Sequence, residues 1–295
     1  MENKVTTPDY IKLHLVIFVW GFTGILGKLI SIPSASIVWY RTFIAFISLA
    51  AFLFLKKKSW RLDSSESYKY LGTGIVVATH WFFFFEALKV STVSVTLATL
   101  ASATLFTSVL EPLFFKKKIV PYEIIFGLIV IAGLMIIFQF ETKYHLGIIY
   151  SLISAFCASL FTTLNGIFVS KGGNPTHITM YEMLGSVLLI SLYYIFTGSF
   201  NMETLGLMNN GMETFWWDSF YLLILGTICT SIAFVISVDV MKKLTPFTVS
   251  ISINMEPIYA IIMALLFFGE KEQMSLGFYI GAALVMATIF GNGVM

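Results

Sequence analysis

Residues 252–268 read SINMEPIYAIIMALLFF and place a glutamate and a proline side by side within an otherwise apolar run. A proline inside a helix removes one backbone donor and tends to kink the helix. An acidic side chain in apolar surroundings is costly unless it is partnered. Glu256 and Pro257 therefore mark a place where the chain accepts an irregular and polar position inside a hydrophobic segment.

The whole chain shares the apolar character of this segment. Of its 295 residues, 58% are hydrophobic and 12% are charged, and the mean hydropathy is +0.88. Soluble domains carry about 25% charged residues. Stretches of roughly twenty apolar residues recur along the chain, and each can cross a hydrocarbon core of ~30 Å. The sequence predicts an all-α membrane protein with ten transmembrane helices, at 11–30, 35–55, 69–89, 91–115, 119–140, 146–170, 176–197, 218–241, 246–268 and 274–293.

The positive residues predict the orientation of these spans. With the N-terminus in the cytoplasm, 13 of the 18 Lys and Arg residues lie inside and 4 outside, and Arg41 lies within a span. The positive-inside rule therefore predicts that both termini are cytoplasmic, and the expected location is a prokaryotic cytoplasmic membrane. The net charge of +2 reflects this loop bias and indicates no nucleic-acid partner. The first apolar segment is long and a second follows at once, so we expect a span and not a cleaved signal peptide.

The two halves of the chain repeat the same order of features. Three pairs of segments align at offsets of 153, 154 and 141 residues, and the longer loop at 198–217 absorbs the difference. Because each half holds an odd number of spans, the halves have opposite orientations. The sequence thus predicts a 5+5 inverted repeat around a central cavity, as in many secondary transporters, with repeats at 11–140 and 146–293. The aligned pairs are EALKVSTVSV (86–95) with DVMKKLTPFT (239–248), GLIVIAGLMIIF (127–138) with GAALVMATIFGN (281–292), and WYRTFIAFISLAAFLF (39–54) with MYEMLGSVLLISLYYI (180–195).

Several stretches resemble one known family. EPIYAIIMALLFFGEKEQMSLGFYIGAALVMATIF (256–290) resembles the second EamA-type repeat of the drug/metabolite transporter superfamily. VWGFTGILGKLI (19–30) is similar to the family's first helix, WYRTFIAFISLA (39–50) to its second, and FFFFEALKVSTVSVTLATL (82–100) to its third and fourth. The resemblance implies a basket of eight helices around the cavity, with the fifth and tenth helices outside it. It also implies the export of amino acids, related metabolites or drugs, or the exchange of sugar phosphates or nucleotide sugars.

The first half departs from the family pattern. Ser102 or Ala103 stands where the repeat proline should lie, and LEPLFFKKK (110–118) replaces the closing GE. We therefore expect the fourth helix to be straighter than the ninth.

Charged residues within the spans are candidates for gating. An ionised side chain at the bilayer centre costs roughly 2.5–3.5 kcal/mol on insertion scales, so each one needs a partner or a role. Arg41 and Glu86 are expected to pair near the outer face, and their repeat counterparts, Glu182 and Asp239, lie near the inner face. The alternative is that these groups snorkel to the membrane surface.

Other side chains are candidates for substrate binding. His80 suits a proton-linked or substrate-orienting role, and a carboxyl at Glu256 could bind a substrate ammonium or carry a proton. Pro257 is the expected helix kink, which frees a backbone carbonyl toward the cavity. Each polar candidate could instead be a packing residue that hydrogen-bonds a neighbouring helix. The predicted substrate-binding residues are Trp20, His80, Trp81, Phe84, Thr99, Ser102, Asn165, Asn254 and Glu256.

These features favour a secondary transporter, and most of all an exporter of amino acids or related small metabolites. The alternatives are a drug carrier, a nucleotide-sugar or sugar-phosphate carrier, and a membrane-embedded or lipid-modifying enzyme. The enzyme is disfavoured because HExxH, GxSxG and P-loop motifs are absent. No cofactor or metal site is expected, since Cys157 and Cys229 have no metal-ligand spacing. The expected partners are a small molecule, the lipid bilayer and, as a candidate coupling ion, the proton.

Overall fold

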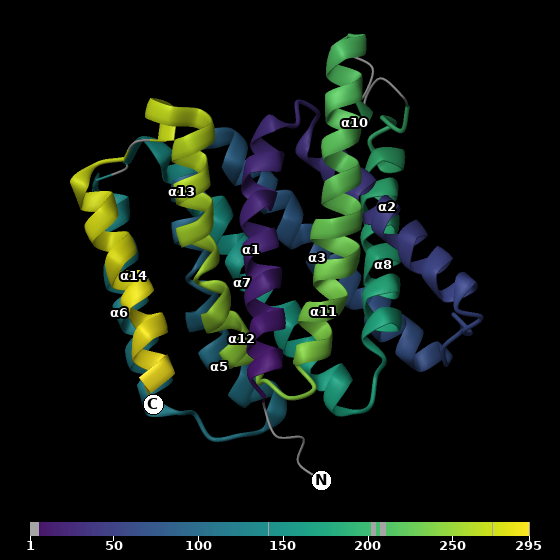
Figure 1. Ribbon diagram of the computed structural model, residues 1–295, viewed down its shortest axis with the longest axis horizontal. Helices are drawn as coiled ribbons and strands as arrows, with labels where there is room; N and C mark the ends of the chain where they lie inside the picture. Colours follow the sequence, from purple (N-terminus) through teal and green to yellow (C-terminus); the bar gives the residue numbers. More distant parts are fainter. Residues whose placement is uncertain (1–5, 141, 202–204, 207–210, 273, 295) are drawn as a thin grey trace.

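The computed structural model describes residues 6–140, 142–201, 205–206, 211–272 and 274–294. Within these residues the chain consists of helices joined by short connections (Figure 1). Residues 202–204 and 207–210 of the predicted 198–217 loop lie outside the described residues. The helices are α1 (Thr7–Leu29), α2 (Ser34–Leu55), α3 (Ser64–Val90), α4 (Val93–Leu100), α5 (Ala103–Phe115), α6 (Pro121–Phe140), α7 (His145–Ser170), α8 (Pro175–Phe196), α10 (Met212–Gly226), α11 (Ala233–Val240), α12 (Pro246–Ile253), α13 (Glu256–Phe268) and α14 (Leu276–Val294), with 3₁₀ segments at Thr142–Tyr144 and Gly269–Glu272 and a π-helical segment at Thr227–Ile232.

These helices form the ten predicted spans, because α4 with α5, α10 with α11, and α12 with α13 each make one span. Eight spans of the described chain are long and apolar enough to cross a membrane by length and composition, and α6 is a shorter apolar helix over Pro121–Ile137. Large apolar side chains such as Phe54, Phe196 and Leu266 are exposed on the outer surface, where lipid would cover them. The protein is a multi-pass integral membrane protein.

Contacts at the two ends of the bundle show how the spans alternate. Lys243, at the start of the ninth span, forms an ion pair of 2.9 Å with Asp9 at the start of the first. At the opposite end Ser31, which follows α1, donates to Asp218 of α10 over 2.6 Å. In Figure 1 α1 begins and α14 ends at the same end of the molecule, as an even number of spans requires.

The fourth and ninth spans are both interrupted near their middle. The ninth breaks between Ile253 and Glu256, as the adjacent proline suggests, and the fourth breaks between Leu100 and Ala103. The expectation of a straighter fourth helix is therefore wrong. Its backbone tightens without a proline, since the amide of Ser102 donates to the carbonyl of Thr99 over 3.0 Å. The breaks are 153 residues apart, which is the offset of the sequence repeat.

The two interrupted spans cross each other. Helix α4 packs against α13, and α5 packs against α12. Thr92 and Thr245, also 153 residues apart, each cap the helix that begins the span, accepting from the amides of Val95 and Thr248 over 3.1 Å. Equivalent elements of the two halves thus meet in opposite orientations, which confirms the inverted repeat.

Helix α3 approaches α8 closely enough to require glycine on both sides. A Cβ atom added at Gly74 would lie 2.2 Å from the carbonyl oxygen of Glu182, and one added at Gly185 would lie 2.2 Å from that of Leu71. Small residues permit such contacts between membrane helices. By contrast, α6 and α14 pack on each other at one side of the molecule (Figure 1) and leave the other helices to surround the centre.

Candidate functional site

A cavity lies at the centre of the bundle, where α1, α2, α3, α7 and α11 meet the two interrupted spans. The space open to the centres of water-sized molecules is about 80 Å³, whereas one buried water needs roughly 10–15 Å³ on that measure. The cavity therefore has room for several waters or one small metabolite in this conformation. Of the predicted site residues, those that line it are Trp20, Arg41, His80, Trp81, Phe84, Asn254, Glu256 and Pro257.

Arg41 brings a positive charge to this cavity from α2. Its side chain is buried, and its Nε and Nη2 atoms donate to Thr230 Oγ1 over 3.1 and 2.8 Å. The guanidinium lies 3.9 Å from the centre of the Trp81 ring, which gives a favourable cation–π contact. Nη1 has no hydrogen-bond partner among the described residues. The two N–H donors of Nη1 thus remain available.

Glu256 brings the opposite charge to the same cavity from the start of α13. The residue is buried, with 6% of its surface exposed, and no hydrogen bond or ion pair of its carboxylate is found within the described part of the chain. Pro257 follows at the second position of the helix and has no backbone donor to satisfy there. The break before α13 therefore aims a carboxylate at a cavity that also holds Arg41, without joining the two charges.

His80 is fixed on the cavity wall by α7. Its Nδ1 atom lies 2.9 Å from the carbonyl oxygen of Ser154 and 2.8 Å from Ser154 Oγ. The ring packs edge-on against Phe161 at 5.4 Å and lies nearly parallel to Phe84 at 6.2 Å. This arrangement orients the imidazole, and among the described residues Nε2 makes no hydrogen bond.

The π-helical segment Thr227–Ile232 shapes one wall of the cavity. Its wider turns let Thr230 accept from Arg41 and let the carbonyl of Cys229 accept from Trp20 Nε1 over 2.9 Å. Single π-turns occur often at functional sites. Just beyond it Phe234 contacts Trp81 at 5.8 Å and Phe161 at 5.5 Å, so this wall is aromatic.

Three predicted substrate-binding residues lie outside the cavity lining. Thr99 and Ser102 are buried at the break of the fourth span, and neither hydroxyl has a hydrogen-bond partner within the described chain. Asn165 is buried on α7, where its Nδ2 atom donates to Glu182 Oε2 over 3.5 Å. The structure thus separates Asn165 and Glu182 from the other candidates and pairs them with each other.

The predicted pair of Arg41 with Glu86 is not formed. Arg41 faces Trp81 and Phe85 of α3, the latter at 5.5 Å from the guanidinium. Glu86 follows Phe85 by one residue, so it points about 100° away around the helix, and it is half-buried. At the predicted inner end the two acids are separate: Asp239 forms an ion pair of 2.7 Å with Lys242, and Glu182 accepts a hydrogen bond from Asn165. The repeat symmetry located these charges in the chain but did not determine which of them meet.

Polar contacts between the two repeats lie along the crossing of α5 with α12. Asn254 Nδ2 donates to Thr104 Oγ1 over 3.0 Å, and Thr107 Oγ1 donates to Ser250 Oγ over 3.1 Å. One turn further on, the carboxylate of Glu111 accepts from a backbone amide of α12. Three successive turns of α5 thus hold the first half of the ninth span.

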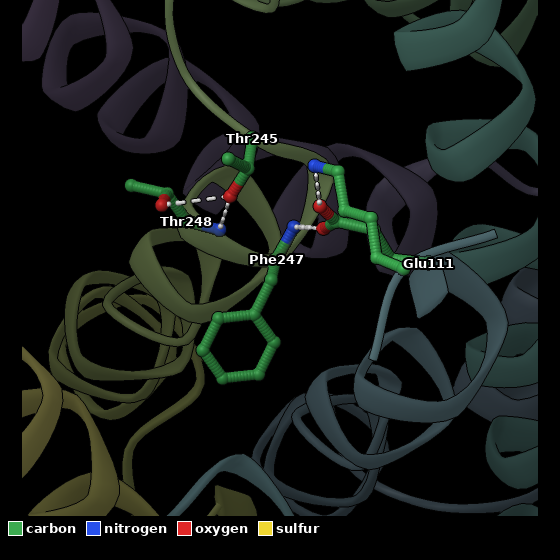
Figure 2. A network of polar contacts seen from close by, with 5 residues as sticks. Glu111, Thr245, Phe247 and Thr248 are labelled. Carbon is green, nitrogen blue, oxygen red and sulfur yellow. Dashed lines mark hydrogen bonds and ion pairs between the residues drawn. The ribbon is translucent and has the colours of Figure 1, made fainter. Parts of the chain in front are cut away.

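Figure 2 shows the last of these contacts. Glu111 Oε2 accepts from the amide of Phe247 over 2.7 Å, and Lys117 Nζ lies 3.4 Å from Oε1. Pro246 begins α12 without a donor, and Thr245 satisfies the amide of Thr248. At the first three positions of this helix the amide is therefore either absent or hydrogen-bonded.

Sequence reasoning did not single out several residues of the site. Threonine and serine are common in membrane helices, so the hydroxyl side chains gave no signal that separates cavity lining from packing. Phenylalanines are too numerous in this chain, at 29, to be told apart. The additional polar and aromatic residues are Thr23, Phe161, Thr162, Phe234, Ser237 and Ser250 in the lining, and Thr230 beside Arg41.

Comparison with known proteins gives three findings. The profile of the EamA-like transporter family matches residues 10–139 and again residues 145–294. The uncharacterized transporter YxxF of Bacillus subtilis (strain 168) is 22% identical over 285 residues, which cover 93% of this chain and 86% of that protein. A chain of known crystal structure with 15% identity superposes with a TM-score of 0.70 and covers 97% of each chain. At this identity the likeness to the crystal structure shows the fold alone.

Proposed function

Because this chain belongs to the EamA-like transporter family, we propose that it is a secondary transporter that exports amino acids or related small zwitterionic metabolites. Family membership makes the protein a transporter of small molecules and not an enzyme. The zwitterionic substrate and the outward direction are the proposal.

The observation that carries this proposal is a pair of opposite charges that share one cavity without forming an ion pair. Arg41 keeps the N–H donors of Nη1 free beside Trp81, and the carboxylate of Glu256 has no partner in the described chain. A substrate carboxylate would complete the hydrogen bonds of the guanidinium. A substrate ammonium would neutralise Glu256. One zwitterion would thus remove the cost of two separately buried charges.

The rest of the cavity suits the side chain of such a substrate. Trp20, Phe84, Phe161 and Phe234 supply an apolar and aromatic wall, as small-molecule sites usually have around a few polar groups. Asn254 adds an amide at the break of the ninth span. These features favour amino acids with apolar or aromatic side chains.

A phosphorylated substrate fits this cavity poorly. Arg41 is the one Lys or Arg among the described residues that line it. Recognition of a phosphate group usually takes clustered arginines or lysines. A cationic drug is the second candidate, because Glu256 and the aromatic residues would bind it, although the positive charge of Arg41 opposes it.

Transport in proteoliposomes tests the proposal. The probes are radiolabelled L-leucine and L-phenylalanine, together with their methyl esters, which lack the carboxylate, and their deaminated acids, which lack the ammonium. We expect the amino acids to be carried at least about tenfold better than either analogue, since a hydrogen bond to a charged group contributes about 1.5–3 kcal/mol. Transport of the esters alone would favour the cationic-drug alternative, and no transport of any amino acid would contradict the proposal.

Variants then test which residue binds each charged end of the substrate. Glu256→Gln keeps size and hydrogen bonding but removes the charge, so we expect KM for the amino acid to rise about tenfold or more while the deaminated acid is unaffected. Arg41→Lys keeps a positive charge but loses the planar guanidinium, and we expect discrimination against the methyl ester to fall. Glu86→Gln is the control, because Glu86 lies outside the cavity lining. Equal effects on all three probes would show that the two charges serve packing.

A further inference from the structure

A fully buried carboxyl without an ion-pair partner in the described chain lies outside the cavity, between α3, α7 and α8. Glu182 is fully buried, and its contact with the protein is the 3.5 Å hydrogen bond from Asn165 to Oε2. Oε1 has no partner in the described chain, and neither does Oδ1 of Asn165 nor the hydroxyl of Thr179, one turn before Glu182 on α8. These three fully buried oxygen atoms, on two adjoining helices, therefore have no hydrogen-bond partner and no cation in the described chain.

Few charges surround Glu182. On α3, Tyr70 is the titratable side chain close enough to interact with it. On α2, Arg41 faces the cavity and binds Thr230, and on α11 Asp239 pairs with Lys242 near the surface. α7 contributes the neutral Asn165. No cation of the described structure neutralises Glu182 directly, and an unpaired carboxylate in the membrane interior is costly.

Helix α7 links Glu182 to the substrate cavity. Asn165 lies one turn from Thr162, which lines the cavity. Behind Glu182, α8 is held tightly to α3 at Gly74 and Gly185. A change in the packing of α7 around Asn165 would therefore alter the hydrogen bonding of the carboxyl.

We propose that Glu182 binds the coupling proton of this transporter, with Asn165 as its hydrogen-bond partner, in a site separate from the substrate cavity. The packing described here favours a bound proton, because it offers the carboxylate no cation. In a conformation that admits water between α7 and α8 the proton leaves to the side that is open. Proton binding and release thereby become tied to the conformational change that moves substrate. This inference rests on the proposed secondary transport, but it concerns the ion and not the substrate.

The test compares two modes of transport by Glu182→Gln in proteoliposomes. Exchange of labelled L-leucine at equal pH needs substrate binding and movement but no net proton transfer, so we expect it to stay within about twofold of the wild type. Accumulation driven by a pH gradient should fall at least about tenfold, because the variant has no proton to carry. Glu182→Asp keeps the carboxyl and should retain part of the driven accumulation. Glu256→Gln is the matched control and should impair both modes.

Other outcomes overturn the inference. Full accumulation by Glu182→Gln under a pH gradient would show that the proton binds elsewhere. Accumulation by the wild type under a sodium gradient alone would make the buried oxygens a sodium site instead. If the wild type carries no amino acid, the proposed substrate fails, and the proton site is then tested without substrate. Infrared difference spectra between acidic and alkaline buffer should show a protonated-carboxyl band that Glu182→Gln lacks and Glu256→Gln retains. If Glu182→Gln shows the same bands as the wild type, the inference is overturned.

Discussion

The two crossings of the interrupted spans have the same geometry but different chemistry. At the crossing of α5 with α12, Thr104, Thr107 and Glu111 bond to the ninth span over 3.0, 3.1 and 2.7 Å. The corresponding residues of the α4–α13 crossing are found by adding the repeat offset of 153 to the residue numbers of α5 and subtracting it from those of α12. There the positions that correspond to Thr104, Thr107 and Glu111 are Pro257, Ala260 and Ala264, all of them buried. Their side chains cannot form hydrogen bonds, so these three bonds have no counterpart at the corresponding positions.

The inverted repeat is therefore symmetric in its backbone but not in the side-chain interactions that close each end of the cavity. Hydrogen bonds between membrane helices average about 0.6 kcal/mol, so three of them contribute about 2 kcal/mol. An energy of that size biases a two-state equilibrium about thirtyfold. The corresponding positions of the α4–α13 crossing lack these three bonds, and apolar contacts between helices gain no comparable stabilisation in lipid. The crossing of α5 with α12 should therefore be the one that is closed more of the time.

Thiol labelling decides which side of the membrane this polar crossing faces, and its effect is all or none. By the positive residues, the α5–α12 crossing and residues 56–61 lie on the cytoplasmic side. In a background without Cys157 and Cys229, Met212→Cys should react with an impermeant reagent added outside, and Lys58→Cys should not. Both positions are exposed. The reverse pattern would place the polar crossing on the outside and overturn the predicted orientation.

A disulfide across each crossing tests whether both must open. The hydroxyl oxygens of Thr107 and Ser250 are 3.1 Å apart, so cysteines there can bond with small adjustments. In the background without native cysteines, we expect oxidation of Thr107→Cys with Ser250→Cys to slow transport at least about tenfold, since alternating access must separate the repeats. Reduction should restore it.

The equivalent pair, Leu97→Cys with Ala260→Cys, tests the crossing of α4 with α13 in the same way. When this crossing is locked, transport should also stop. In the resting protein, however, its disulfide should form more slowly than that of Thr107→Cys with Ser250→Cys, because the polar crossing is closed more often. Single-cysteine variants under the same oxidant are the controls. Equal rates of formation at the two crossings would mean that the hydrogen bonds create no bias.

The comparison of the two crossings also shows which parts of the structure can be predicted from the sequence. Span lengths and the repeat offset are local or periodic signals, and they predicted the all-helical fold and the opposite orientation of the halves. Glu256 and Arg41 stood out because charges are rare in apolar segments, and both lie in the cavity lining. The break at Ala101–Ser102 did not, because no proline marks it. A backbone turn of this kind depends on contacts that only the folded bundle supplies.

The contacts between side chains of different helices could not be predicted from the sequence. Thr230 reaches Arg41 only because a π-helical segment widens its helix, and no residue in TICTSI (227–232) signals that segment. Glu111 looked like part of a departure from the family pattern, yet it satisfies an amide in the other repeat. Its role follows from a contact across 136 residues, which no local pattern encodes.

Removal of the Glu111 carboxylate should produce the smallest of these effects and tests the polar crossing most directly. Glu111→Ala leaves the buried amide of Phe247 without its acceptor, which costs about 1–3 kcal/mol. For a chain of this size we expect Tm to fall by a few degrees, on the order of 2–4 °C per kcal/mol, and Ser250→Cys to become more reactive to thiol reagents from the cytoplasmic side. Glu111→Gln retains an acceptor oxygen and loses mainly the contact with Lys117, an exposed partner, so its effect should be smaller. Glu66→Ala, an exposed acid in the first turn of α3, is the control. If Glu111→Ala lowers Tm but leaves the reactivity of Ser250→Cys unchanged, the carboxylate stabilises a helix start without holding the two repeats together, and the contrast between the crossings loses its meaning for gating.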